Sequence, residues 1–198
     1  IDEAGRTIGR LEPVAGTEEV RRCAYERGCP FIHGSVMIRA SALAAVGRYD
    51  ARFRAEDYEL WLRLLERFEG DNLAEPLYRL RIHPDSITGR TALRLYAHIE
   101  LALDFAAARR AGKDPNAPPL AEEFARRMQE IEAGRFAPDL LGRHHRRQAR
   151  WFLDHDLGGK ALREAVRAVR SEGINRDNLY LARRGLLSMF GIGRRPEK

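Results

Sequence analysis

The sequence has few cysteines, few lysines and no long apolar run. Its two cysteines, Cys23 and Cys29, have no further Cys or His at the spacing of a zinc site, so we expect two free thiols. No run approaches the roughly 18 to 20 apolar residues that a membrane helix needs, and no signal peptide is recognisable. These absences argue against a cystine-stabilised secreted domain. We expect a cytoplasmic protein, with peripheral contact to the inner face of the membrane as a further option.

Positive charge is unevenly distributed along the 198 residues. From Leu141 onward there are 14 Lys and Arg against 6 Asp and Glu, whereas the first 140 residues carry 21 against 23. Only three of the 35 basic residues are lysines. The basic region could contact an acidic surface, either nucleic acid or an anionic membrane. Aromatic residues that would stack on bases are sparse there, so we expect no nucleic-acid partner, and a solvated arginine face is the simpler alternative.

The pattern of apolar residues predicts an α/β first part and a helical second part. We expect helices over 17–27, 42–46 and 56–68, and strands over 31–39 and 73–83. Beyond residue 91 we expect helices throughout. They are 93–110, 120–132, 142–155, 160–170 and 177–190, with a proline-rich linker at 112–119. The last two should form a hairpin in which Leu162, Val166 and Val169 face Leu179, Leu186 and Leu187.

The helix that begins near Glu56 carries an acid in an unusual position. At about 100° per residue, its apolar side chains fall on one arc, and Glu59, Arg63, Glu66 and Arg67 fall opposite. Asp57 lies in the middle of the apolar arc, one turn before Trp61. It is either a carboxylate placed favourably at a helix N-terminus or a catalytic base at a cleft.

The expected strand over 73–83 also carries an unusual face. From Leu77 onward the alternation places Arg79, Arg81 and His83 on one side. Such a face fits an anionic ligand, and an exposed edge strand is the alternative.

Four segments, in this order and spacing, resemble the second half of the family 2 glycosyltransferases. They are residues 33–39 (HGSVMIR), 45–50 (AVGRYD), 53–63 (FRAEDYELWLR) and 78–87 (YRLRIHPDSI). The resemblance covers roughly residues 1–90, and the helical region 91–198 resembles C-terminal extensions only loosely. It implies a partial GT-A-type sheet, Rossmann-like and mostly parallel, with helices on both sides and an all-helical C-terminal extension.

The resemblance also implies a reaction. Such enzymes transfer a sugar from a nucleotide-sugar donor to an acceptor hydroxyl, with inversion at the anomeric carbon. Asp57 matches the acid that serves as general base, and Glu56 matches a supporting acid. The acceptor would be a saccharide or a lipid-linked saccharide in the synthesis of cell-envelope polysaccharide. Four residues would contact it. These are His33, Gly34, Ser35 and Trp61.

For the donor, the resemblance implies that Arg79 and Arg81 contact the diphosphate. His83 corresponds to a ligand of the divalent metal, Mg²⁺ or Mn²⁺, that some members use. In the family an Asp-x-Asp motif precedes these segments, but residues 1–32 contain neither that motif nor a glycine-rich phosphate loop, and the sequence does not begin with Met. We therefore expect an acceptor-side portion of a longer enzyme, inactive as an isolated chain.

Overall fold

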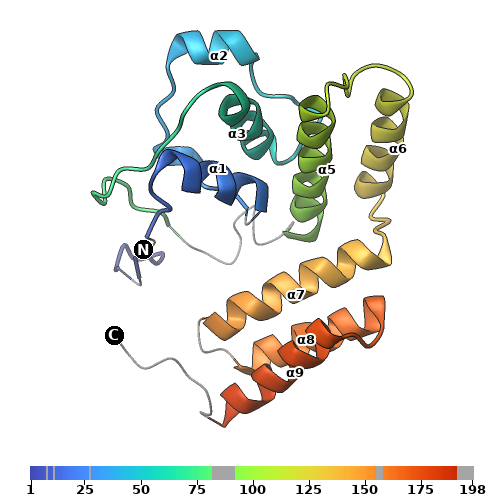
Figure 1. The fold of residues 1–198 in the computed structure, drawn as a ribbon. Coiled ribbons are helices and arrows are strands. Elements are labelled where there is room, and N and C mark those ends of the chain that lie inside the picture. Colours follow the sequence, from blue (N-terminus) through green and yellow to red (C-terminus); the bar gives the residue numbers. More distant parts are fainter. Residues whose placement is uncertain (8, 11, 27, 82–91, 155–157, 191–198) are drawn as a thin grey trace. The chain divides into compact units, whose positions relative to one another are not determined.

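The computed structural model describes residues 1–7, 9–10, 12–26, 28–81, 92–154 and 158–190, and throughout these ranges the regular structure is helical (Figure 1). The first elements are α1 (Thr17–Glu26), the 3₁₀ turn η1 (His33–Ser35), α2 (Ala40–Val46) and α3 (Glu56–Arg67). They are followed by α5 (Ala92–Arg110), α6 (Leu120–Glu132), α7 (Pro138–Asp154), α8 (Gly158–Glu172) and α9 (Arg176–Met189). The helices predicted from periodicity are therefore confirmed, with boundaries shifted by a few residues.

The predicted α/β fold with a partial GT-A-type, Rossmann-like sheet is wrong, because no described residue lies in a strand. In the first strand candidate, local bonds replace a ladder: the Ser35 N–H and the Ser35 hydroxyl both donate to the Ile32 carbonyl, each at 2.8 Å. In the second, residues 73–81 form an exposed irregular segment with a bend at residues 74–75, and Leu73 and Leu77 are well exposed. Alternation alone forms no strand, since a sheet needs a second segment to hydrogen-bond to the first.

The chain divides into two compact units, Ile1–Glu132 and Ala133–Lys198. The first thus includes α5 and α6, and α5 packs against α3. A functional division near residue 90 remains a prediction. The expected linker over 112–119 is the connection between α5 and α6 and begins with Gly112 at a φ of +71°.

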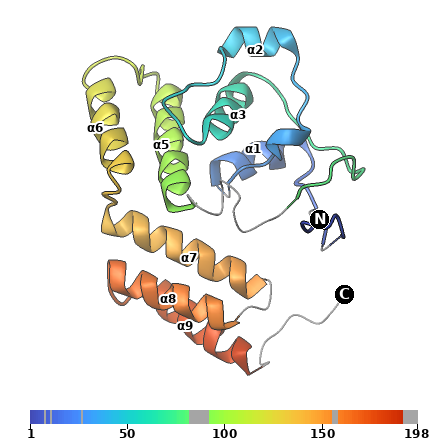
Figure 2. The ribbon, with the colours of Figure 1, turned by 180° about the vertical axis from the view of Figure 1, so that it is seen from behind.

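Helix α3 is the centre of the first unit. Helices α1, α2 and α5 all pack against it (Figure 1, and Figure 2 from behind). Three acids in its first turn favour the start of the helix, and the Phe68 N–H closes its end on the Leu64 carbonyl. Because it has neighbours on several sides, α3 buries more than one face. Its buried side chains are Tyr58, Glu59, Leu60, Trp61, Leu62 and Leu65.

The second unit consists of α7, α8 and α9, which pack against one another. The predicted hairpin is present, but its predicted contacts are partly wrong, because Leu179 and Leu186 are about half exposed. The helices approach instead through small residues. A Cβ added at Gly185 would lie 2.7 Å from the Leu162 backbone nitrogen, and Ala161, Ala165 and Ala168 of α8 are buried. Small side chains let two backbones come closer than leucines would, so the leucines turn outward.

Two expectations from composition are also resolved. Cys23 and Cys29 are both free cysteines, as predicted. No helix in the described ranges has both the length and the apolar character to cross a membrane.

Candidate functional site around Asp57

Asp57 lies in the first turn of α3 with its side chain about a quarter exposed (27%). Its Oδ1 atom accepts a hydrogen bond of 2.7 Å from the backbone N–H of Tyr58. Its Oδ2 atom lies 3.7 Å from His33 Nδ1. One carboxylate oxygen is therefore fixed by the helix, while the other faces η1 and remains accessible.

His33 joins Asp57 to a residue from a third segment. Its Nε2 atom lies 3.0 Å from the hydroxyl of Tyr49, in the loop between α2 and α3. The His33 and Tyr49 rings are 5.6 Å apart between centroids. Asp57, His33 and Tyr49 thus form a row of polar groups at the surface. Tyr49 was given no role in the sequence analysis, although it falls inside one of the four segments that resemble glycosyltransferases.

Trp61 supports this row from the core side. It is 1% exposed, and its ring contacts the His33 ring edge-on at 6.0 Å and the Phe31 ring at 5.7 Å. A side chain so deeply buried would act on an acceptor chiefly through His33. Direct acceptor binding by Trp61 stays a prediction.

Gly34 and Ser35 complete η1 beside His33. A Cβ at Gly34 would lie 2.8 Å from Cζ of the Tyr78 ring, so the glycine leaves room for that tyrosine. The Ser35 hydroxyl donates its proton to the Ile32 carbonyl and holds the turn closed. Glu56, half-buried, begins α3 next to Asp57. The predicted roles of these residues, as supporting acid and acceptor contacts, remain predictions.

The predicted diphosphate and metal residues are placed differently. Arg81 Nη1 donates to the backbone carbonyls of Asp2, at 2.8 Å, and Glu3, at 2.5 Å. Arg79 is exposed, and His83 lies outside the described residues. Within those residues, no group of three or more His, Cys, Asp or Glu side chains could hold a metal. The described side chains thus do not assemble a metal site, and the metal stays a prediction that depends on His83.

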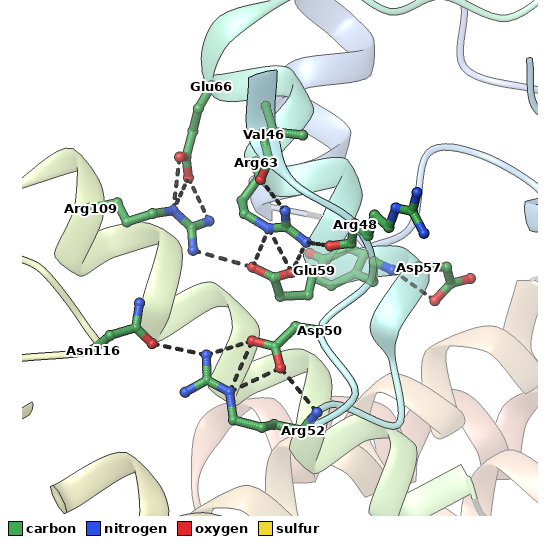
Figure 3. A network of polar contacts seen from close by, with 11 residues as sticks. Val46, Arg48, Asp50, Arg52, Asp57, Glu59, Arg63, Glu66, Arg109 and Asn116 are labelled. Atoms are coloured by element: carbon green, nitrogen blue, oxygen red, sulfur yellow. Dashed lines mark hydrogen bonds and ion pairs between the residues drawn. The ribbon is translucent and has the colours of Figure 1, made fainter. Parts of the chain in front are cut away.

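A buried charge network behind Asp57 was not predicted (Figure 3). Glu59, expected on the polar face of α3, is only 2% exposed. It accepts hydrogen bonds from Arg63 Nε, at 2.8 and 3.0 Å, and from Arg109 Nη1 at 3.3 Å. Arg109 also pairs with Glu66 at 2.8 Å. The sequence signal was the spacing of four residues between Glu59 and Arg63, which is equally common on exposed helices.

Arg63 connects this network to the loop that carries Tyr49. Its Nη1 atom donates to the Val46 carbonyl at 2.5 Å, and its Nη2 atom donates to the Arg48 carbonyl at 2.8 Å (Figure 3). The loop is therefore tied to α3 at the residue that precedes Tyr49. The Glu59–Arg63 ion pair therefore holds the loop backbone next to Tyr49, whose hydroxyl contacts His33.

Asp50 and Arg52 secure the other end of the same loop. Burial works against ionisation of Asp50, but the hydrogen bonds from Arg52 outweigh it and lower the pKa of Asp50. Arg52 Nη2 also donates to the Asn116 side chain at 2.9 Å (Figure 3). The polar row is thus built on a loop with fixed ends.

Two curated proteins share sequence with this chain. A Bacillus subtilis (strain 168) protein named as a glycosyltransferase, EpsE, is 42% identical over 69 residues, which is 33% of this chain and 25% of EpsE. The O-antigen biosynthesis glycosyltransferase WbnJ of Escherichia coli is 38% identical over 99 residues, 48% of this chain and 38% of WbnJ. Over these stretches the chain is similar to bacterial glycosyltransferases. The matches span about a quarter to two-fifths of the length of these relatives. No family model matches the chain, and no solved structure matches it.

Proposed function

We propose that this chain contributes the acceptor-binding and catalytic-base residues of an enzyme that transfers a sugar from a nucleotide-sugar donor to an acceptor hydroxyl. The observation that carries the proposal is the accessible carboxylate of Asp57, with one oxygen held by the helix and the other facing His33 and Tyr49. Similarity to two glycosyltransferases supports the class of reaction.

The residues present suggest a single-displacement mechanism. An acceptor hydroxyl is a poor nucleophile, and a carboxylate within hydrogen-bond reach can remove its proton as the new bond forms. In the proposed step, Asp57 Oδ2 takes the proton, the acceptor oxygen bonds to the anomeric carbon, and the bond from that carbon to the phosphate oxygen breaks. The nucleoside diphosphate leaves with the bonding electrons, the configuration inverts, and Asp57 later releases the proton to water.

His33 and Tyr49 would position the acceptor. The distance of 3.7 Å between His33 Nδ1 and Asp57 Oδ2 is too long for a good hydrogen bond. An acceptor hydroxyl could therefore donate a hydrogen bond to Asp57 Oδ2 without first breaking a strong hydrogen bond between Asp57 and His33. His33 and the Tyr49 hydroxyl offer further polar atoms along the same row, as a saccharide with neighbouring hydroxyls requires.

The proposal also includes residues that would bind the diphosphate and the metal. Arg79 is the exposed guanidinium for the diphosphate, whereas Arg81 would first have to leave the Asp2 and Glu3 carbonyls. If His83 holds Mg²⁺ or Mn²⁺, the metal would neutralise charge on the leaving diphosphate. In that case, EDTA should abolish transfer by the complete protein, and Mn²⁺ or Mg²⁺ should restore it.

The proposal is tested by incubating the complete protein with a panel of UDP-, GDP- and dTDP-sugars and a mixture of saccharide and lipid-linked saccharide acceptors. Release of nucleoside diphosphate should depend on an acceptor, and NMR of the product should show the anomeric configuration opposite to that of the donor. Retained configuration would contradict the mechanism. Absence of acceptor-dependent release with every donor would contradict the assignment to sugar transfer.

A further inference from the structure

The outer face of α9 carries apolar side chains that no described helix covers. Leu179, Leu186 and Phe190 are 54%, 48% and 72% exposed. They follow one another at intervals of seven and four residues, so they form a line along one side of the helix. The buried residues Leu181 and Gly185 lie on the opposite side. Further exposed apolar residues flank this line in the second unit, namely Val166, Ile174, Tyr180 and Met189.

The packing of the hairpin explains why these residues face outward. Helices α8 and α9 meet through glycine and alanine, and the core between α7, α8 and α9 is formed by Ala149, Ala165 and Leu181. Among the larger side chains of this segment, Leu181 lies in the core, whereas Leu179, Leu186 and Phe190 lie outside it. A contiguous apolar patch on a surface is costly in water and commonly marks an interaction site.

The same face is strongly cationic. Arg176, Arg183 and Arg184 of α9 are exposed between and beside the apolar residues. The exposed face of α8 adds basic residues at helical spacing, namely Lys160, Arg163, Arg167 and Arg170.

The acids of this hairpin are each paired with a basic group. Glu164 pairs with His145 at 2.8 Å, Glu172 pairs with Arg146, and Asp177 lies 3.7 Å from Arg150. From Gly158 to Met189, seven basic side chains stand against these three acidic ones. The solvent side of the hairpin is therefore an apolar line within a positive field.

We propose that this α8–α9 face binds the surface of an anionic lipid bilayer, with Leu179, Leu186 and Phe190 entering the acyl boundary and the arginines contacting lipid phosphates. Aliphatic side chains between arginines suit this partner, because they gain from leaving water while the guanidinium groups stay at the headgroups. A nucleic acid would leave the leucines exposed to water, and the exposed residues include few of the aromatics that stack on bases. The inference does not depend on the proposed sugar transfer.

The test is co-sedimentation of the complete protein with phosphatidylcholine vesicles, with and without about 30 mol% phosphatidylglycerol. Binding should be about tenfold stronger to the anionic vesicles and should weaken as NaCl rises from about 50 to about 300 mM. The triple variant Leu179→Ser, Leu186→Ser, Phe190→Ser should lose about tenfold in binding. The double variant Arg183→Gln, Arg184→Gln should lose its preference for anionic vesicles.

A matched control removes exposed apolar side chains from the first unit. Met37, Leu73 and Leu77 are 99%, 68% and 76% exposed, and their change to serine should leave vesicle binding unaltered. Circular dichroism of each variant checks that the helices are retained. Equal binding by the α9 triple variant and the parent would overturn the proposal. So would the absence of binding to anionic vesicles, including the case in which a duplex oligonucleotide binds instead.

Discussion

The two carboxylate oxygens of Asp57 have different surroundings. The hydrogen bond from the Tyr58 N–H fixes Oδ1 at the start of α3. Oδ2 faces the His33 ring, whose Nδ1 lies 3.7 Å away. The two explanations for an acid on the apolar arc of α3 are therefore compatible, since one oxygen serves the helix start and the other is available for chemistry.

Gly34 offers a test of how closely the site is packed. Gly34→Ala would place a Cβ against the end of the Tyr78 side chain, which is exposed and can move aside. We expect a thermal midpoint within about 2 °C of the parent, because no core residue is displaced. We also expect an acceptor KM raised about fivefold or more, because the Tyr78 ring that is displaced lies against η1, the turn that carries His33. A thermal midpoint many degrees lower, with an unchanged KM, would contradict this prediction.

The sequence could place Asp57 and His33 in one region only through the resemblance of their segments to glycosyltransferases. Periodicity showed that Asp57 was unusual but not what it faced. Tyr49 could not be found by either route, because its role depends on where the α2–α3 loop ends. That position is set by Arg63, four residues after Glu59 on the next helix.

At the scale of elements, α3 departs from the simple amphipathic pattern because it has packed neighbours on several sides. A helix with one exposed face would leave Glu59 in water, but α5 brings Arg109 against it. A buried carboxylate is tolerated only when it is paired and hydrogen-bonded. Such pairing between distant segments is not visible in local sequence spacing.

Removal of the Glu59 charge should destabilise the fold strongly. Glu59→Gln would leave Arg63 and Arg109 without their shared buried carboxylate, and we expect a loss of about 3 kcal/mol in the free energy of unfolding. Glu66→Gln is the matched control, because Glu66 is more exposed and, within the described residues, its ion pair is with Arg109; its loss should be about 1 kcal/mol. Urea titration measures both. Equal, small losses would show that the Glu59 network is not the stronger one.

The strands were mispredicted for a related reason. Residues 73–81 alternate between apolar and polar side chains, but the apolar ones are exposed. The Leu80 carbonyl accepts from the Ile1 N-terminus at 2.8 Å, yet no ladder forms in the described chain. An alternating pattern shows which side chains a strand could bury on one face. Whether a strand forms depends on a second segment that hydrogen-bonds to its backbone. The apolar pattern of α9 was misleading in the same way. Its leucines were expected to face α8, but α8 and α9 pack through small residues, so Leu179 and Leu186 are exposed.

At the scale of the molecule, one buried histidine connects three parts of the first unit. His98 of α5 is 1% exposed; its Nε2 lies 3.1 Å from Glu132 at the end of α6, and its Nδ1 accepts from the Arg54 N–H at 3.4 Å. Arg54 also pairs with Glu132 at 2.6 Å, and Arg94 Nη2 donates to the Glu132 carbonyl at 3.2 Å. Because Nδ1 accepts, the neutral ring with its proton on Nε2 fits these partners best.

This cluster predicts the pH dependence of stability. Burial lowers the pKa of His98 below 6.5, although Glu132 opposes the shift. The hydrogen bond from Arg54 is the largest cause that lowers the pKa of Glu132, from 4.5 to about 2. In both cases the unfolded chain binds more protons, so stability falls as pH drops below about 6.5 and falls further between 4.5 and about 2.

Urea midpoints measured between about pH 8 and pH 5 test the histidine part of this prediction. The His98→Gln variant should show a smaller decrease over that range than the parent. Some decrease should remain, because burial also lowers the pKa of His144 in the second unit. Identical pH profiles for the parent and His98→Gln would show that His98 does not contribute.

The central claim is that Asp57 removes the proton of the acceptor hydroxyl, and its most direct test is the turnover of Asp57→Asn in the complete protein. Asparagine keeps the size of the side chain but cannot take the proton, so kcat should fall about a hundredfold or more with little change in donor KM. Asp104→Asn, which removes an exposed acid paired with Arg127 on α6, should keep parental turnover. Turnover of Asp57→Asn within a few fold of the parent would contradict the claim.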